Sequence, residues 1–165
     1  MNPVHLHLLL NHLPVVGTVF GVLFLAFALV RRDSGLAKAS FGFLAVIGAF
    51  AVAVYLTGEP AQEAVEKLPG FPERLIDRHE DAALLATILT GTIGALALAA
   101  LVFYRRRPLP RSLTAVALVC ALGTAVTMAY TANLGGQIRH AEIRGGAASP
   151  VGKVPAVGED VSDEH

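Results

Sequence analysis

The sequence predicts an all-α protein, a four-transmembrane-helix bundle, from three observations. Hydrophobic residues make up 54% of the 165 residues and charged residues only 16%, whereas roughly a quarter of residues are charged in soluble domains. Each predicted span approaches the roughly 20 residues that a helix needs to cross a bilayer. A soluble bundle is disfavoured because its helices would keep a charged face, whereas four segments contain no Asp, Glu, Lys or Arg at all. These segments are residues 13–30, 39–57, 82–104 and 112–133.

The first helix is expected over residues 3–30. Asn2 is a suitable N-cap and Pro3 a suitable first helical residue, so the helix should begin before the membrane. Pro14 then lies inside the helix and removes one backbone hydrogen bond, which predicts a bend near the outer interface. We expect this bend to aim His12 into the bundle.

The other helices are expected over residues 39–57, 73–104 and 112–133, so that residues 1–144 form one membrane domain. The connection between the second and third helices should be partly helical, because EPAQEAVEKL has a helical composition with a proline near its start. The Pro/Gly turn that follows predicts a helix beginning near Glu73. The tail, residues 145–165, is acidic and rich in Gly, Pro and Ala, and we expect it to be flexible.

The distribution of charge predicts the orientation. The loops RRDSGLAK and RRRPLPR contain seven of the 13 basic residues and one acid, Asp33, so the positive-inside rule predicts that they are cytoplasmic. Both termini and residues 58–81 then face the periplasm of a bacterial inner membrane. The 13 basic and 13 acidic residues balance, so no nucleic acid partner is expected. Membrane lipid and a larger membrane complex or periplasmic redox partner are the expected partners.

All six histidines fall on the predicted outer side. His12, His79 and His140 lie within one or two turns of the predicted membrane boundary on three different helices, where ionisable groups usually serve a function. They are the main candidate ligands. His5 shares a helix face with His12 but lies about 10 Å from it along the axis, so His5 would serve only a second cofactor. His7 points roughly opposite to His5 and is interpreted as an interfacial residue.

Neutral imidazole is a good axial ligand for haem iron, and bundles often hold cofactors between facing helices. We therefore predict haem b, with its iron held by two of the three main candidates and with His12 and His79 preferred, since both begin helices that enter the membrane from the same side. Zinc and copper sites have less support, because the chain has one cysteine and two methionines. Nearby charges that could orient ligands or haem propionates are Glu80, Arg139, Glu142 and Arg144.

Three segments carry a family resemblance: NHLPVVG, the HED before the third helix, and NLGGQIRHAEIR after the fourth. They resemble a family of uncharacterised bacterial four-helix integral membrane proteins that are suspected of binding haem, like b-type cytochromes. The resemblance spans most of residues 1–145. It implies four membrane helices with a histidine-rich outer end, and His12, His79 and His140 occupy the matching positions.

These observations favour a small membrane b-type cytochrome or haem-bearing electron-transfer subunit that acts near the periplasmic face. Two alternatives stay open: a cofactor-free accessory subunit of a larger respiratory or photosynthetic complex, and a metal-binding or sensing membrane protein. The sequence contains no Gly-rich phosphate loop and no nucleophile elbow. An electron-transfer or accessory subunit is therefore expected rather than a stand-alone enzyme.

Overall fold

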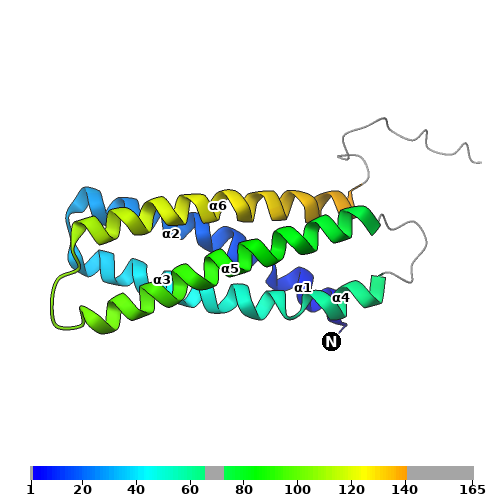
Figure 1. Cartoon of the computed structure of the whole chain (residues 1–165), viewed down its shortest axis with the longest axis horizontal. Helices are drawn as coiled ribbons and strands as arrows, with labels where there is room; N and C mark the ends of the chain where they lie inside the picture. The colour runs from blue at the N-terminus through cyan, green and yellow to red at the C-terminus, as the bar shows by residue number, and fades with distance from the viewer. Residues whose placement is uncertain (1, 66–72, 141–165) are drawn as a thin grey trace, which may run out of the picture.

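The computed structural model describes residues 2–65 and 73–140. Every regular element in these residues is an α-helix, which confirms the all-α prediction. Long helices run side by side along one axis (Figure 1). Four helical segments are long and apolar enough to cross a membrane: Val4–Arg31, Ser34–Ala64, Glu73–Phe103 and Arg111–Ile138.

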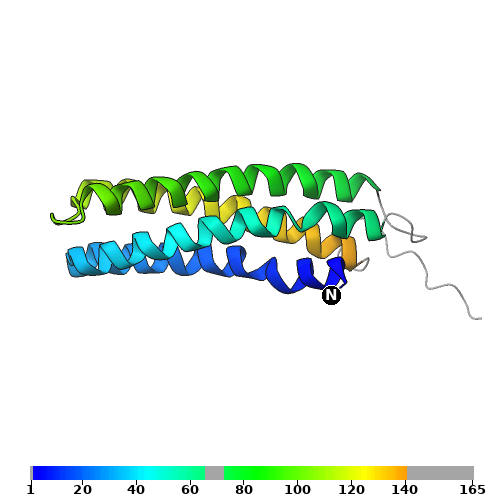
Figure 2. The same cartoon turned by 90° about the horizontal axis from the view of Figure 1, so that it is seen from below.

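The first of these segments is divided into α1 (Pro3–Leu10) and α2 (His12–Arg31). The side chain of Asn2 caps α1 by accepting the backbone N–H of Val4 at 3.0 Å. The break falls at Asn11, where Pro14 has no N–H to offer the Leu10 carbonyl one turn earlier. The predicted bend is therefore confirmed, and Figure 2 shows the offset between the two helices.

The second segment contains α3 (Ser34–Tyr55) and α4 (Gly58–Val65). Helix α3 begins earlier than the predicted residue 39, because the Asp33 carboxylate accepts the backbone N–H groups of Gly35 and Leu36 at 2.7 and 3.1 Å. Helix α4 confirms that the outer connection is partly helical.

The remaining helices are α5 (Glu73–Phe103) and α6 (Arg111–Arg139). Helix α5 begins at Glu73, as the Pro/Gly turn predicts, while α6 continues beyond the predicted end at residue 133. The turn between them is anchored by Leu109, whose side chain is only 5% exposed. Its backbone N–H donates to the Ser34 hydroxyl at 2.9 Å. The predicted flexible tail, residues 145–165, lies outside the described residues.

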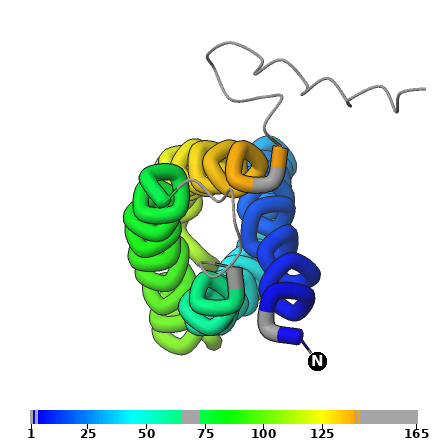
Figure 3. The backbone as a smooth tube through the Cα atoms, turned by 90° about the vertical axis from the view of Figure 1, so that its right-hand side faces the viewer, coloured from blue at the N-terminus to red at the C-terminus, as the bar shows by residue number. Residues whose placement is uncertain are grey.

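The helices form a ring in which α2 packs on α3 and α6, and α5 packs on the same two helices (Figure 3). Backbones approach closely at Gly48 of α3 and Gly94 of α5: a Cβ added to either would lie 2.9 Å from the Cα of the other. Close contact of small residues is typical of membrane helices. Large apolar side chains such as Phe27 (54% exposed) and Val126 (70% exposed) face outward, where lipid would cover them.

Candidate functional site

The bundle has two ends (Figure 1), and the residues at these ends differ in chemistry. We call the end formed by α1, α4, the start of α5 and the last turns of α6 the histidine end. The opposite end, which we call the arginine end, is formed by the turns over residues 31–38 and 104–111. The histidine end contains every histidine among the described residues, namely His5, His7, His12, His79 and His140.

His79, on the second turn of α5, is half-buried against α6. Its Nδ1 atom lies 3.1 Å from the backbone carbonyl oxygen of Thr131. A carbonyl only accepts, so Nδ1 carries the hydrogen and donates it. The ring packs on the backbone at Gly135, where an added Cβ would lie 3.1 Å from the imidazole Cε1. The ring is therefore held in one orientation by α6.

His7 is also half-buried, in the middle of α1 and beside the junction of α3 and α4. Its Nδ1 lies 2.9 Å from the hydroxyl oxygen of Thr57. That hydroxyl donates its single hydrogen to the Val54 carbonyl at 2.6 Å. With that hydrogen committed to Val54, the hydroxyl oxygen accepts from His7 Nδ1–H. The Val54 carbonyl, which only accepts, also interacts with the His7 ring and favours the same tautomer. Gly58 lies next to the ring, and a Cβ added there would be 3.7 Å from Cε1.

The same nitrogen, Nε2, is therefore available in both rings. With Nδ1 acting as the donor in both, the lone pair of neutral imidazole resides on Nε2. In residues 2–65 and 73–140 neither Nε2 makes a hydrogen bond. The rings of His7 and His79 are near enough to interact electrostatically, although they come from helices far apart in the sequence. The arrangement provides two oriented imidazole nitrogens, each with an available lone pair.

A third acceptor lies one helical turn after His7. The side-chain oxygen of Asn11 is buried and has no hydrogen-bond donor in the described part of the chain. Buried polar atoms are nearly always paired in native proteins, so this atom calls for a partner outside the described structure. It lies at the break caused by Pro14, on the same side of the chain as His7.

The expectation that His12 points into the bundle is wrong. His12 is exposed, and its Nδ1 donates to the Leu8 carbonyl of the same helical segment at 3.1 Å. The buried positions nearby are Pro14 and Gly17. His12 precedes Pro14 by two residues, which rotates it about 200° around the helix to the opposite side.

Three of the other predicted site residues are exposed. His5 and Glu80 are exposed. His140 is exposed at the end of α6, where its backbone N–H donates to the Gly136 carbonyl at 2.9 Å. Arg139 is the last residue of α6. The predictions for Glu142 and Arg144, like His165, fall outside the described residues.

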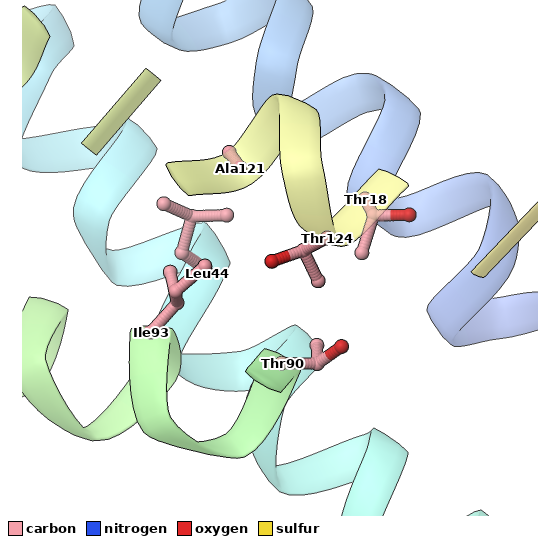
Figure 4. Close-up of a pocket in the computed structure, with 6 residues that line it drawn as sticks. All are labelled: Thr18, Leu44, Thr90, Ile93, Ala121 and Thr124. Carbon is pink, nitrogen blue, oxygen red and sulfur yellow. The ribbon is translucent and has the colours of Figure 1, made fainter. Parts of the chain in front are cut away.

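The centre of the bundle holds a small cavity of about 10 Å³ (Figure 4). Three threonine hydroxyls near it all donate to carbonyls of their own helices at 2.6–2.9 Å. This volume is close to the minimum for one water molecule. No charged residue and no histidine lines the cavity, so we treat it as packing space. Its lining residues are Thr18, Leu44, Thr90, Ile93, Ala121 and Thr124.

Sequence reasoning missed His7, although a signal was present. Gly21 and Gly17 pack on α3. At intervals of three or four residues before Gly17, the sequence has Pro14, then Asn11, then His7. This spacing follows one face of a helix. Tracing it would have placed His7, rather than His12, on the side that faces the bundle.

Comparison with curated proteins finds no match, and comparison with solved structures finds none either. A family model described as "Predicted membrane protein (DUF2231)" matches residues 3–142. That match covers α1 to α6 and includes both half-buried histidines. The chain therefore belongs to the DUF2231 family of predicted membrane proteins.

Proposed function

We propose that this protein is a small membrane b-type cytochrome in which the imidazoles of His7 and His79 would hold the iron of haem b at the histidine end. One observation carries the proposal: two half-buried imidazoles on α1 and α5 have Nδ1 occupied as a donor and Nε2 available. Histidines that bind metals through Nε2 typically donate Nδ1–H to a carbonyl or another acceptor in this way.

The donor set supports haem more than a bare metal ion. In the described residues no group of three or more His, Cys, Asp or Glu side chains could hold a metal, whereas protein zinc sites use three or four such ligands. Haem iron already has four porphyrin nitrogens and needs at most two ligands from the protein. His7 and His79 would supply this number, and bundles commonly place such ligands on facing helices.

The chain would orient and bury the cofactor, and bound haem would supply one-electron redox chemistry. Thr57 and the Thr131 carbonyl keep the rings of His7 and His79 in the tautomer that leaves Nε2 unprotonated. Hydrogen bonds to Nδ1 also raise the basicity of the ligand nitrogen. The position at one end of the bundle would allow electron exchange with a partner outside the membrane.

The choice of His7 in place of His12 rests on burial and hydrogen bonding. His12 is exposed, while His7 is half-buried and held by a group from another helix. A ligand that is held by tertiary contacts before the cofactor arrives costs less ordering entropy on binding. We therefore expect His7, His79 and the haem iron to form the site, with His5, His12 and His140 outside it.

The test is a reduced-minus-oxidised absorbance spectrum of full-length protein purified from its native membrane, together with metal analysis of the same sample. We expect the bands of a low-spin b-type haem. His7→Gly and His79→Gly should each lose the low-spin spectrum, and added imidazole should restore it by occupying the vacated position. His5→Gly is the matched control on α1 and should leave the spectrum unchanged.

Two results would overturn the proposal. Absence of haem would do so: bound metal without haem would support the metal-binding alternative, and absence of both would support the accessory-subunit alternative. A low-spin spectrum that survives His7→Gly but disappears in His12→Gly would show that the first-helix ligand is His12.

A further inference from the structure

The arginine end carries a large excess of positive charge without internal neutralisation. Its two turns contain seven basic residues and one acid, Asp33. The Asp33 carboxylate is engaged by the backbone N–H groups at the start of α3. Among the described residues, none of the seven basic side chains forms an ion pair with a carboxylate. The balancing negative charge must therefore come from outside the described chain.

Three of these cations surround an open depression of about 500 Å³. It is lined by Arg105, Arg106 and Arg107 of the α5–α6 turn and by Val102 and Phe103 from the last turn of α5. The two apolar side chains are 59% and 74% exposed. The depression thus places guanidinium groups directly beside apolar surface, at the end of a segment that is long and apolar enough to cross a membrane.

The backbone that presents these arginines is fixed by contacts with α3 and the core and by a hydrogen bond within the turn. Leu109 is buried in the core and bonded to Ser34. The Arg107 N–H donates to the Tyr104 carbonyl at 3.1 Å, and the Lys38 ammonium donates to the Arg105 carbonyl at 3.4 Å. A fixed backbone reduces the entropy lost when a ligand binds. The Lys38 contact also places a fourth cation beside the backbone of Arg105.

We propose that this depression binds an anionic phospholipid, with its phosphate on Arg105–Arg107 and the upper part of an acyl chain on Val102 and Phe103. Guanidinium groups bind phosphate oxygens in pairs, with two parallel hydrogen bonds. Basic clusters at the ends of membrane helices attract anionic lipids. The exposed apolar pair distinguishes a lipid from free phosphate, because phosphate alone would gain nothing from Val102 and Phe103. This site is independent of the proposed haem site.

The test measures lipid retention by full-length protein in neutral detergent, using native mass spectrometry and titration with phosphatidylglycerol or phosphatidylcholine. We expect phosphatidylglycerol to be retained and phosphatidylcholine to be lost. Replacing Arg105, Arg106 and Arg107 together by Gln should weaken phosphatidylglycerol binding about tenfold or more, since each cation near a membrane surface contributes measurably to anionic lipid binding. Phe103→Ala should weaken it by a smaller factor, about threefold, because only apolar contact is removed.

The matched control replaces Arg31, Arg32 and Arg111 by Gln, which removes the same number of charges from the same end but leaves the depression intact. This control should retain phosphatidylglycerol. Equal losses in the two triple variants would indicate attraction by the overall charge and would overturn the proposed site. Displacement of the lipid by millimolar inorganic phosphate, or equal retention of phosphatidylcholine, would overturn it as well. If the Arg105–Arg107 variant does not fold, the three single Gln variants and Phe103→Ala provide the same comparison.

Discussion

The histidine end and the arginine end use their hydrogen bonds in opposite ways. At the histidine end, Thr57 and the Thr131 carbonyl hold the side chains of His7 and His79. At the arginine end, side chains hold the backbone instead: the Ser34 hydroxyl accepts the Leu109 N–H, and Lys38 donates to a carbonyl. The first arrangement orients partly buried ligand atoms, while the second leaves exposed guanidinium groups available to an outside partner. We therefore propose an internal site at one end of the bundle and a surface site at the other.

The test of membrane orientation should give the largest effect, because a cysteine on one side of the membrane is either labelled or not. The positive-inside rule predicts that the arginine end is cytoplasmic. In a Cys120→Ala background, Arg107→Cys should resist a membrane-impermeant thiol reagent on intact cells, whereas the exposed Glu59→Cys should react. The opposite pattern would invert the topology and would place the proposed haem site in the cytoplasm.

The independence of the two ends is tested by measuring both haem binding and lipid retention in a variant of each end. We expect His79→Gly to abolish low-spin haem while leaving phosphatidylglycerol retention unchanged. The Arg105–Arg107 triple Gln variant should do the reverse. Effects at sites without shared contacts usually add to within about 0.5 kcal/mol. A loss of haem in the arginine variant would mean that the two ends are coupled and that their separation into two sites is wrong.

Removing the buried anchor of the arginine end should cost considerable stability. Leu109→Ala creates a cavity in the core and should lower the free energy of unfolding by about 2–4 kcal/mol. It should also weaken lipid retention, since the arginines lose their fixed backbone. Leu8→Ala at the histidine end is the control, because Leu8 is 47% exposed. Denaturant unfolding in detergent followed by circular dichroism measures both. Equal destabilisation would show that Leu109 is not an anchor.

The packing of His79 on α6 is tested by two glycines of the same helix. Gly135→Ala places a Cβ 3.1 Å from the imidazole Cε1, so the ring must shift, and we expect destabilisation of about 1–2 kcal/mol with weaker haem binding. Gly123→Ala meets nothing within 4 Å in the described structure and should be neutral or slightly stabilising through helix propensity. Haem titration of both variants decides whether the contact at Gly135 positions the ring.

The hydrogen bond to His7 should give the smallest effect. Thr57→Val keeps the side-chain shape but removes the acceptor of His7 Nδ1–H, which should weaken haem binding by about 1 kcal/mol. It should also shift the midpoint potential, because ligand basicity changes. Thr127→Val is the control, since the Thr127 hydroxyl donates to the Thr124 carbonyl of its own helix and forms a hydrogen bond with neither histidine in the described structure. Equal shifts in the two variants would mean that Thr57 does not act on the site.

Much of the fold follows from local features that a sequence displays directly. Long uncharged segments predict the spans, Pro14 predicts the break at Asn11, and the Pro/Gly turn predicts a helix beginning at Glu73. Each of these features acts within one or two helical turns of the residue concerned. The observed boundaries of a helix differ from the predicted ones where a capping residue extends the helix, as Asp33 does for α3.

The candidate site depends on contacts that are distant in the sequence. His79 stands out from its position at the start of a span, but its bond to Thr131 joins residues 52 positions apart. His7 meets Thr57 across 50 positions. A local sequence pattern cannot predict which residues so far apart in the sequence will be in contact. The prediction for His12 failed because it assumed that a bend turns the nearest histidine inward, whereas the buried face continues from Pro14 to Asn11 and His7.

The sequence by itself determined the class, the number of candidate spans and the division of histidine and arginine between the two ends, because hydropathy and turn residues act locally. Only the tertiary structure decided which imidazoles face the bundle and which nitrogen each presents. That outcome depends on how far each helix is rotated about its axis. Small residues such as Gly48 and Gly94 set this rotation where helices touch, so it is a property of the packed bundle and not of any single segment.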